Sequence, residues 1–310
     1  MSCSLCSYGL CSLTMQTKQQ IQLLLASAGV RPNKRFGQHF LIDLNLMEKL
    51  VDSAGIEHND IVLEVGCGTG SLTEAIAEQA GKVIAVELDT TLAKIAEKKL
   101  AKAKNVEIIN TDILENKNTI SPIVTDAIEL ARKSASGRVL LVANISYNVA
   151  SAVVLNLVTG PRAADSMHIT VQKEVADRMT AAPGSKHYGI LSILLSATGD
   201  VKTERILKPT VFWPRPTVDS AMVSFVRRKD KVGRIDNIAI LREVVSLFMG
   251  HRRKMLKGCT KFAKGSLAGI KNWQEIFEKC SINSHDRPQQ IRPEDYIAIA
   301  NLCYKHGNPE

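Results

Sequence analysis

The stretch Ile61-Val-Leu-Glu-Val-Gly-Cys-Gly-Thr-Gly70 decides the fold of this chain. Its apolar beginning predicts a buried strand, and its three glycines let the backbone turn tightly beneath a ligand before a helix starts near Ser71. A second apolar run, at 83–86, ends in Glu87 and Asp89. A carboxylate at such a strand end can accept hydrogen bonds from both hydroxyls of a ribose. The two stretches together predict a nucleoside-bearing cofactor that lies across two parallel strands.

The spacing of the glycines distinguishes between two cofactor classes. Dinucleotide-binding turns follow G-x-G-x-x-G, whereas Gly66, Gly68 and Gly70 follow G-x-G-x-G. The acidic Glu64 also precedes the first glycine by two positions. An acid there suits a ligand with a positive ammonium or sulfonium group better than a pyrophosphate, which needs bare amide donors. The pattern therefore favours S-adenosylmethionine, while an ordinary strand-to-helix turn is the alternative without a ligand.

Strand-like and helix-like runs alternate along most of the chain. Such alternation predicts an α/β fold with a parallel, doubly wound, Rossmann-like sheet. After the charged segment 227–231 the apolar pattern becomes helical, which predicts a small C-terminal helical domain. We expect a methyltransferase domain over 15–230 and a helical RNA-binding domain over 231–310. The expected strands lie at 61–64, 83–87, 106–110, 139–143, 167–171, 201–206 and 221–226, and the expected helices at 72–80, 92–101, 120–133 and 189–197.

The first fourteen residues carry no charge and no clear apolar core, so we expect a non-native or disordered extension, with translation starting at Met15. A helix is predicted after Met15, ending at Gly29. The seven cysteines contain no repeated C-x-x-C pair, which favours cytosolic thiols and no metal over a disulfide framework or a zinc site. Half of a metal site at Cys3 and Cys6 is the alternative, although no partner ligands follow. No apolar run reaches the roughly 20 residues of a membrane span.

Positive charge gathers in one part of the chain. Residues 201–264 hold sixteen Lys and Arg against five Asp and Glu, and the whole chain has a net charge of +9. The remainder is therefore close to neutral. Clustered cations that neutralise phosphates release counterions, so this segment predicts a nucleic-acid partner. A solvated basic surface without a partner is the alternative.

Polar residues follow two further strands, where ligands bind in such sheets. Asp112 is placed to accept a hydrogen bond from a cofactor adenine, although a helix-capping role is the alternative. Asn144-Ile-Ser-Tyr147 has the form of an amine-methylating motif. The Asn144 oxygen and the Ile145 carbonyl can accept the two hydrogens of a nucleobase amine and hold its lone pair toward a sulfonium methyl. Tyr147 offers a face for base stacking, whereas a turn residue beside a core tyrosine is the alternative.

Seven motifs in order give the chain a family resemblance. The chain resembles the ribosomal RNA adenine dimethyltransferase A family of the KsgA type, over about residues 17–302. The motifs begin at Arg35, Glu64, Glu87, Asn144, Gln172, Phe212 and His251.

The resemblance implies an enzyme that uses S-adenosylmethionine to form N6,N6-dimethyladenine at two adjacent adenosines near the 3′ end of small-subunit ribosomal RNA. It implies a Rossmann-like sheet and a helix that faces RNA. The implied cofactor contacts are His39 and Leu41, in a loop over the site, with Gly66, Glu87, Asp112 and Asn144; Tyr147 and Phe212 sandwich the target adenine, Asn144 holds its amine, and Arg252, Arg253 and Lys254 contact RNA.

Ser146 departs from the family pattern, which has proline there. Proline fixes the backbone beside the amine-binding carbonyl. Serine is expected to leave this turn freer, which predicts slower transfer or accumulation of monomethyl product. The position of His39 is often Asn in the family, and either side chain can form the cofactor hydrogen bond.

Two other functions share parts of this pattern. One is the related methyltransferase that modifies a large-subunit adenine and confers macrolide resistance. The other is a non-catalytic ribosome assembly or transcription factor that keeps the fold and the RNA surface. The long basic tail favours the small-subunit enzyme, and the retained Glu87, Asp112, Asn144 and Tyr147 favour catalysis. We expect a cytoplasmic monomer that meets a preassembled small ribosomal subunit.

Overall fold

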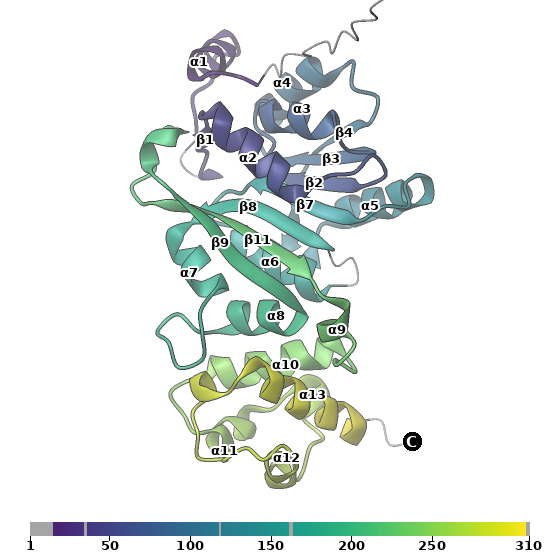
Figure 1. Ribbon diagram of the computed structural model, residues 1–310, viewed down its shortest axis with the longest axis vertical. Coiled ribbons are helices and arrows are strands. Elements are labelled where there is room, and N and C mark those ends of the chain that lie inside the picture. The colour runs from purple at the N-terminus through teal and green to yellow at the C-terminus, as the bar shows by residue number, and fades with distance from the viewer. Residues whose placement is uncertain (1–14, 34–35, 118, 161–163, 308–310) are drawn as a thin grey trace, which may run out of the picture.

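A seven-stranded sheet forms the centre of the molecule (Figure 1). The computed structural model describes residues 15–33, 36–117, 119–160 and 164–307, so the prediction for residues 1–14 lies outside the described residues. The strands lie in the order β4 (Val106–Asn110), β3 (Lys82–Glu87), β2 (Ile61–Val65), β7 (Val139–Asn144), β8 (Ser166–Gln172), β11 (Ser220–Arg227) and β9 (Gly199–Leu207).

The strand order creates the place where a ligand can bind. From β2 the chain moves outward to β3 and β4 and then returns to β7 on the other side of β2. The carboxyl ends of β2 and β7 therefore flank a topological switch point. The strands from β4 to β8 are parallel, as predicted, but β11 and β9 are antiparallel to their neighbours. The later strands pair with each other as a hairpin-like edge, because the connection from β9 to β11 contains only the short 3₁₀ helix η2 (Pro209–Val211) and the two-residue strand β10 (Phe212–Trp213).

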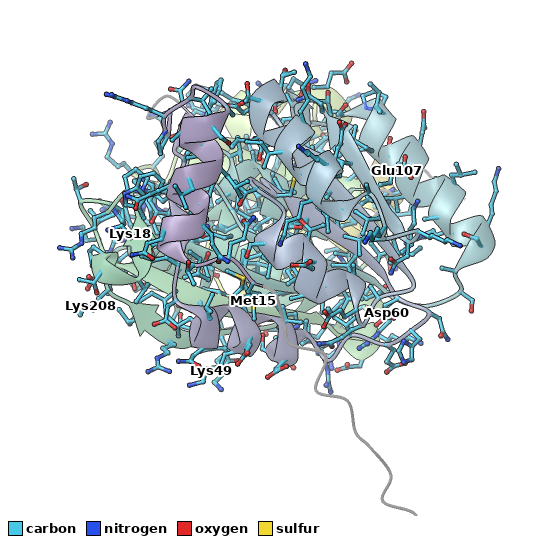
Figure 2. The ribbon with its side chains drawn as sticks, turned by 90° about the horizontal axis from the view of Figure 1, so that it is seen from above. Met15, Lys18, Lys49, Asp60, Glu107 and Lys208 are labelled. Atoms are coloured by element: carbon cyan, nitrogen blue, oxygen red, sulfur yellow. The ribbon has the colours of Figure 1, made fainter. Side chains whose placement is uncertain are left out.

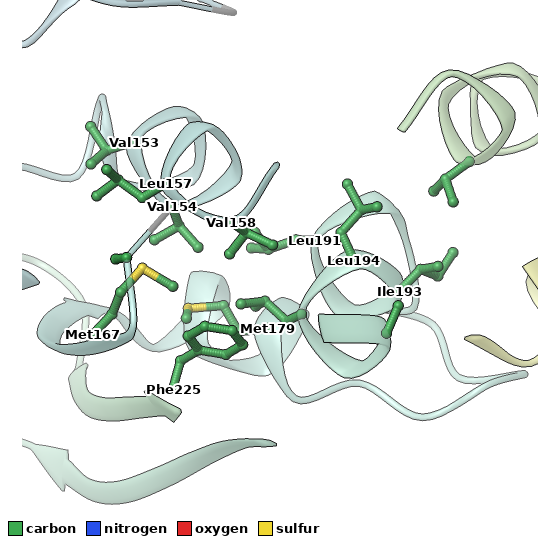
Figure 3. Close-up of a cluster of buried hydrophobic side chains, with 14 of the residues drawn as sticks. Val153, Val154, Leu157, Val158, Met167, Met179, Leu191, Ile193, Leu194 and Phe225 are labelled. Carbon is green, nitrogen blue, oxygen red and sulfur yellow. The ribbon is translucent and has the colours of Figure 1, made fainter. Parts of the chain in front are cut away.

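Alternating side chains of the strands face two different helical layers. Val62 packs in the cluster of α2 and α3, whereas Ile61 and Leu63 pack in the cluster of α5, α6, α7 and α8. Figure 3 shows the second layer, where Val154 and Val158 of α6 lie near Leu191 of α8. The first layer consists of α2 (Leu44–Ala54), α3 (Ser71–Ala77) and α4 (Thr90–Leu100), and the second of α5 (Pro122–Ser134), α6 (Ala150–Thr159), α7 (Lys173–Met179) and α8 (Ile190–Thr198).

An ion pair joins the starts of two central strands. Asp60, just before β2 (Figure 2), accepts hydrogen bonds from the backbone N–H of Arg138 at 2.9 Å and from its Nη2 at 2.6 Å. The Asp60 side chain is 2 % exposed. Burial raises the pKa of this carboxyl, but the hydrogen bonds from Arg138 and from the Glu57 N–H, together with the charge of Arg138, lower it overall. The pair thus holds β2 and β7 in the register that aligns Ile61 with Val139.

Short elements surround the switch point. The predicted N-terminal helix is α1 (Lys18–Ser27), and the chain leaves it through Gly29 with φ of 68°. The two-residue strands β1 (Phe40–Leu41) and β10 (Phe212–Trp213) pair with each other, and so do β5 (Leu114–Asn116) and β6 (Thr119–Ile120). The segment predicted as a charged linker instead ends β11 and forms the short helix α9 (Lys229–Val232).

The C-terminal part is helical, as predicted (Figure 1). Phe248 is buried there against the rings of Trp273, Phe277 and Tyr296. The same buried cluster continues through α8 to the sheet. The division at residue 230 into two domains stays a prediction. The elements are α10 (Ile238–Gly250), α11 (Leu256–Cys259), η3 (Thr260–Phe262), η4 (Gly265–Leu267), α12 (Trp273–Lys279), η5 (Pro288–Gln290) and α13 (Pro293–Gly307). Within the ranges that the structure describes, no helix is both long and apolar enough to cross a membrane.

Candidate cofactor and amine site

The glycine turn after β2 adopts the conformation that its spacing predicted. Gly66, Gly68 and Gly70 have φ values of 80°, 59° and 78°, in the left-handed region that favours glycine. A Cβ at Gly68 would lie 3.0 Å from the ring of Phe40, so a side chain there would also crowd the loop above. The turn therefore brings main-chain atoms directly to the edge of the sheet.

The carboxylate of Glu87 connects this turn to the neighbouring strand. Its Oε2 accepts a hydrogen bond from the Gly68 N–H at 2.8 Å, and its Oε1 accepts one from the Asp89 N–H at 2.9 Å. Each carboxylate oxygen has a further lone pair with which it can accept a ribose hydroxyl. Burial raises the pKa of Glu87, and the two amide donors oppose this effect. The geometry fits the ribose-binding role predicted for this residue.

A cavity of about 250 Å³ opens between the turn and the strand ends. The described walls of this cavity bring together seven of the residues predicted from sequence. They are His39, Leu41, Gly66, Glu87, Asp112, Asn144 and Tyr147.

Glu64 lies at the base of this cavity and has an unusual environment. Its side chain is buried, and among the residues that the structure describes its Oε2 has no hydrogen-bond partner. The pKa of this carboxyl is raised to about 8, chiefly by burial and also by the nearby Glu87 carboxylate, while Thr73 opposes the shift. An unpaired buried acid is costly unless a positive group arrives. The site thus fits the ammonium-bearing part of S-adenosylmethionine.

Asp112, which was predicted to contact the adenine of the cofactor, lines the same cavity. Its Oδ1 accepts a hydrogen bond from the Leu114 N–H at 2.9 Å, so the carboxyl caps the following turn. Ile113 beside it is buried and also lines the cavity. The capping and cofactor-binding roles are compatible because the carboxylate has a second oxygen.

Two hydrogen bonds fix the orientation of the Asn144 amide. Its Nδ2 donates to the His39 carbonyl at 2.7 Å, and its Oδ1 accepts from the Thr170 hydroxyl. The second lone pair of Oδ1 can accept a hydrogen from an amine in the cavity. Sequence reasoning missed Thr170, because its hydroxyl gives no distinct signal on a buried strand that also carries Ser166 and His168.

Aromatic side chains surround the amide, although not all as predicted. The Tyr147 ring stacks on His39 with centroids 5.4 Å apart, and the Tyr147 hydroxyl lies 2.6 Å from Ser220 Oγ. Phe212, in contrast, is 1 % exposed and packs in the core, and it is absent from the described walls of the cavity. Its neighbour Trp213 is half-buried and stacks on Phe40. The adenine sandwich between Tyr147 and Phe212 stays a prediction, and in this arrangement Phe212 would have to move to take part.

The loop over the cavity is tied to three strand ends. Gln38 Nε2 donates to Asp89 Oδ2 at 3.2 Å, and His39 Nδ1 lies 2.7 Å from the Pro214 carbonyl. The Ser146 hydroxyl donates to the Phe36 carbonyl at 2.6 Å. The hydroxyl thus attaches the turn to the loop, and the expectation that serine leaves the backbone of this turn freer than proline would stays a prediction.

The predicted RNA contacts lie far along the chain, in the C-terminal part. Arg252, Arg253 and Lys254 occupy the turn between α10 and α11, so their prediction as part of a helix is wrong. The helix ends at Gly250, after which the backbone turns. Arg253 and Lys254 are exposed, whereas Arg252 Nη2 donates to Gln289 Oε1 at 3.1 Å.

The sheet, the glycine turn and the cavity together define a Rossmann-like methyltransferase, which confirms the predicted fold class. The sequence model of the family described as ribosomal RNA adenine dimethylase matches residues 29–305. The chain belongs to this family, as the resemblance implied.

Curated relatives agree with this assignment. The chain is 34 % identical over 280 residues to the ribosomal RNA small subunit methyltransferase A of Streptomyces griseus subsp. griseus, a match that covers 90 % of this chain and 92 % of the relative. It is 32 % identical over 279 residues to the protein of the same name from Geobacillus sp. (strain WCH70), which covers 90 % of this chain and 94 % of that one.

Solved structures share the fold. A dimethyladenosine transferase from Plasmodium falciparum superposes with a TM-score of 0.68 at 21 % identity, covering 86 % of this chain and 97 % of that chain. The 23S rRNA methyltransferase ErmE superposes with a TM-score of 0.59 at 20 % identity, covering 84 % and 98 %. At these identities the likeness concerns the fold alone.

Replacing Glu64 with Gln tests the cost of the buried acid. A carboxyl whose folded pKa is raised binds more protons in the folded state, so stability falls as the pH rises from about 4.5 to about 8. Glu64→Gln should remove this fall and stabilise the free protein at pH 7 by on the order of 3 kcal/mol. It should also weaken binding of S-adenosylhomocysteine, measured by calorimetry. Glu107→Gln, on the exposed pair with Lys82, is the control for thermal unfolding. Identical pH profiles for wild type and Glu64→Gln would contradict this assignment.

Replacing Ser146 with Ala tests the tie between turn and loop. Loss of one hydrogen bond of this kind should speed dissociation of S-adenosylhomocysteine about two- to five-fold. Stopped-flow tryptophan fluorescence can follow the release, because Trp213 stacks on Phe40 of the loop region. Ser134→Ala removes a comparable hydroxyl at the end of α5 and should leave the rate unchanged. An unchanged dissociation rate in Ser146→Ala would show that the hydrogen bond from Ser146 to Phe36 does not retain the ligand.

Proposed function

We propose that this protein transfers methyl groups from S-adenosylmethionine to N6 of two adjacent adenosines near the 3′ end of small-subunit ribosomal RNA, giving N6,N6-dimethyladenosines during ribosome biogenesis. The observation that carries the proposal is the oriented Asn144 amide at the mouth of the cofactor cavity. The small-subunit target is supported by the name of the curated relatives. The family described as ribosomal RNA adenine dimethylase supports the adenine substrate.

The geometry suits methyl transfer to an exocyclic amine. Asn144 Oδ1 accepts one amine hydrogen, and the Thr170 hydroxyl and the His39 carbonyl hold the amide in place while it does so. Such a fixed acceptor favours the pyramidal amine, whose lone pair is available for attack. The cofactor, when bound, supplies an electrophilic methyl on a sulfonium. Positioning then contributes most of the rate, because the leaving sulfide is neutral and the proton can pass to water afterwards.

The remaining cavity residues hold the two ligands. Glu87 would bind the ribose of the cofactor, Asp112 its adenine and Glu64 its ammonium group, and all three residues line the cavity. The Tyr147 ring, fixed by Ser220 and His39, offers a stacking face to the target base. His39 and Leu41 close the cavity from the loop side.

The substrate we propose is a preassembled small ribosomal subunit, which a monomer meets in the cytoplasm. Residues 231–310 would act as the RNA-binding domain beside the methyltransferase domain of 15–230. The exposed Arg253 and Lys254 support this role, and the basic segment 201–264 extends it. Cations of this kind position a protein on phosphates, while a single unpaired adenine enters the cavity.

Asn144→Ala tests the proposal. Small subunits lacking adenine dimethylation, labelled S-adenosylmethionine and mass mapping of the RNA would give the products. Wild type should form adjacent dimethyladenosines, and Asn144→Ala should lose at least about 100-fold in rate, because the oriented acceptor is gone. Asn116→Ala, at an exposed residue of β5 outside the described walls of the cavity, is the control.

Each alternative function gives a different result in the same assay. Label only in large-subunit RNA would favour the macrolide-resistance type of enzyme. Absence of label with both subunits would favour a non-catalytic assembly factor. Full activity of Asn144→Ala would contradict the role given to the amide.

A further inference from the structure

A second and larger cavity lies away from the cofactor site. It has a volume of about 1240 Å³ and runs between one face of α10 and the helices α5 and α6. Figure 1 shows α10 as the C-terminal helix closest to α8 and the sheet. We call this cavity the interhelical groove. Along α10 its wall is formed by Ala239, Arg242, Glu243, Ser246, Leu247 and Gly250.

One end of the groove, around η3, has aromatic side chains and is open to solvent. Phe262, in η3, lines it and is 45 % exposed. The His251 ring, also in the groove wall, stacks on Phe262 with centroids 3.9 Å apart. Lys254 Nζ lies 5.6 Å from the centroid of the Phe262 ring. An exposed ring beside a cation is the arrangement on which nucleic-acid bases stack.

The segment that carries Phe262 has only positively charged side chains. Residues 251–274 contain seven Lys and Arg and no Asp or Glu. Lys264 belongs to the groove wall. The acid in that wall, Glu243, accepts hydrogen bonds from the backbone N–H and the hydroxyl of Ser266. The groove is thus complementary to a polyanion, although much of its wall is apolar.

A double-stranded RNA helix does not fit these features, because its bases are stacked inside and mainly its backbone is accessible to the protein. An unpaired RNA segment does, since its phosphates can meet the lysines while its bases contact apolar and aromatic surface. An apolar peptide would meet the apolar wall but would leave the cations without a partner.

We propose that the interhelical groove binds an unpaired stretch of ribosomal RNA, separate from the target adenosines, with Phe262 as the platform on which a base stacks. This inference rests on the proposed function and adds a second contact to it. Arg242 adds a cation to the wall of the groove. Its Nη1 donates to Asn156 Oδ1 at 3.3 Å and to Thr159 Oγ1 at 3.2 Å across the groove. These bonds hold a guanidinium in the wall where a phosphate can reach it.

Phe262→Ala against Met255→Ala is the central comparison. Met255 is 46 % exposed in the same basic segment, but it is not one of the described groove residues. A labelled uridine oligonucleotide, which contains no adenine, and a matched duplex serve as probes in fluorescence anisotropy. Phe262→Ala should bind the single strand about five-fold or more weakly and the duplex unchanged, because stacking is lost. Phe262→Trp should restore binding, and Met255→Ala should match wild type.

The salt dependence separates stacking from charge. Lys264→Ala should reduce the slope of log affinity against log salt by about 1, whereas Phe262→Ala should leave the slope unchanged. Thermal unfolding and binding of S-adenosylhomocysteine should be equal in all four variants. A photo-crosslinking version of the oligonucleotide should label residues of the groove.

Three outcomes would overturn the inference: equal affinities for Phe262→Ala and Met255→Ala, an equal loss on duplex and single strand, or crosslinks that fall outside the groove. Methylation of small subunits by the wild type is measured in parallel. If the wild type methylates them while Phe262→Ala binds RNA normally, only the groove assignment fails. If the wild type neither binds RNA nor methylates, the proposed function fails with it.

Discussion

The hydrogen bonds of the Glu87 carboxylate are the interaction on which the rest of the site depends. One oxygen holds the Gly68 N–H and the other the Asp89 N–H, so a single side chain fixes the glycine turn against the end of β3. Three glycines with positive φ have little conformational preference of their own. Without this carboxylate the turn would be connected to β3 only by the hydrogen bonds that the Gly66 and Cys67 N–H groups donate to the Val86 carbonyl.

The same edge of the sheet collects the groups that act on the substrate. The end of β7 carries Asn144, and β8 supplies the Thr170 hydroxyl that orients it. The loop before β1 is bound to the end of β7 and to the turn after it, because the His39 carbonyl accepts from Asn144 and the Phe36 carbonyl accepts from Ser146. Cofactor site, amine site and covering loop are therefore linked by direct hydrogen bonds. A change in one of them is expected to reach the others.

Much of this arrangement could be predicted from sequence, because it depends on local signals. The glycine spacing, the acid at Glu87 and the strand-end position of Asn144 each follow from short patterns. The missing parts depend on contacts between distant segments. The antiparallel edge strands, the partner Thr170 and the core position of Phe212 arise from register and packing, which no short motif contains. The turn at 251–254 was expected to be helical because the family resemblance implied a helix that faces RNA there, whereas α10 ends at Gly250.

The central claim is that the Glu87-supported turn forms the cofactor site, and calorimetric titration with S-adenosylhomocysteine of wild type and Glu87→Gln tests it most directly. The wild type should bind one equivalent, and Glu87→Gln should bind at least about ten-fold more weakly while remaining folded, because a charged acceptor for the ribose and the turn is lost. Absence of binding by the wild type, or equal affinity of the two proteins, would contradict the account.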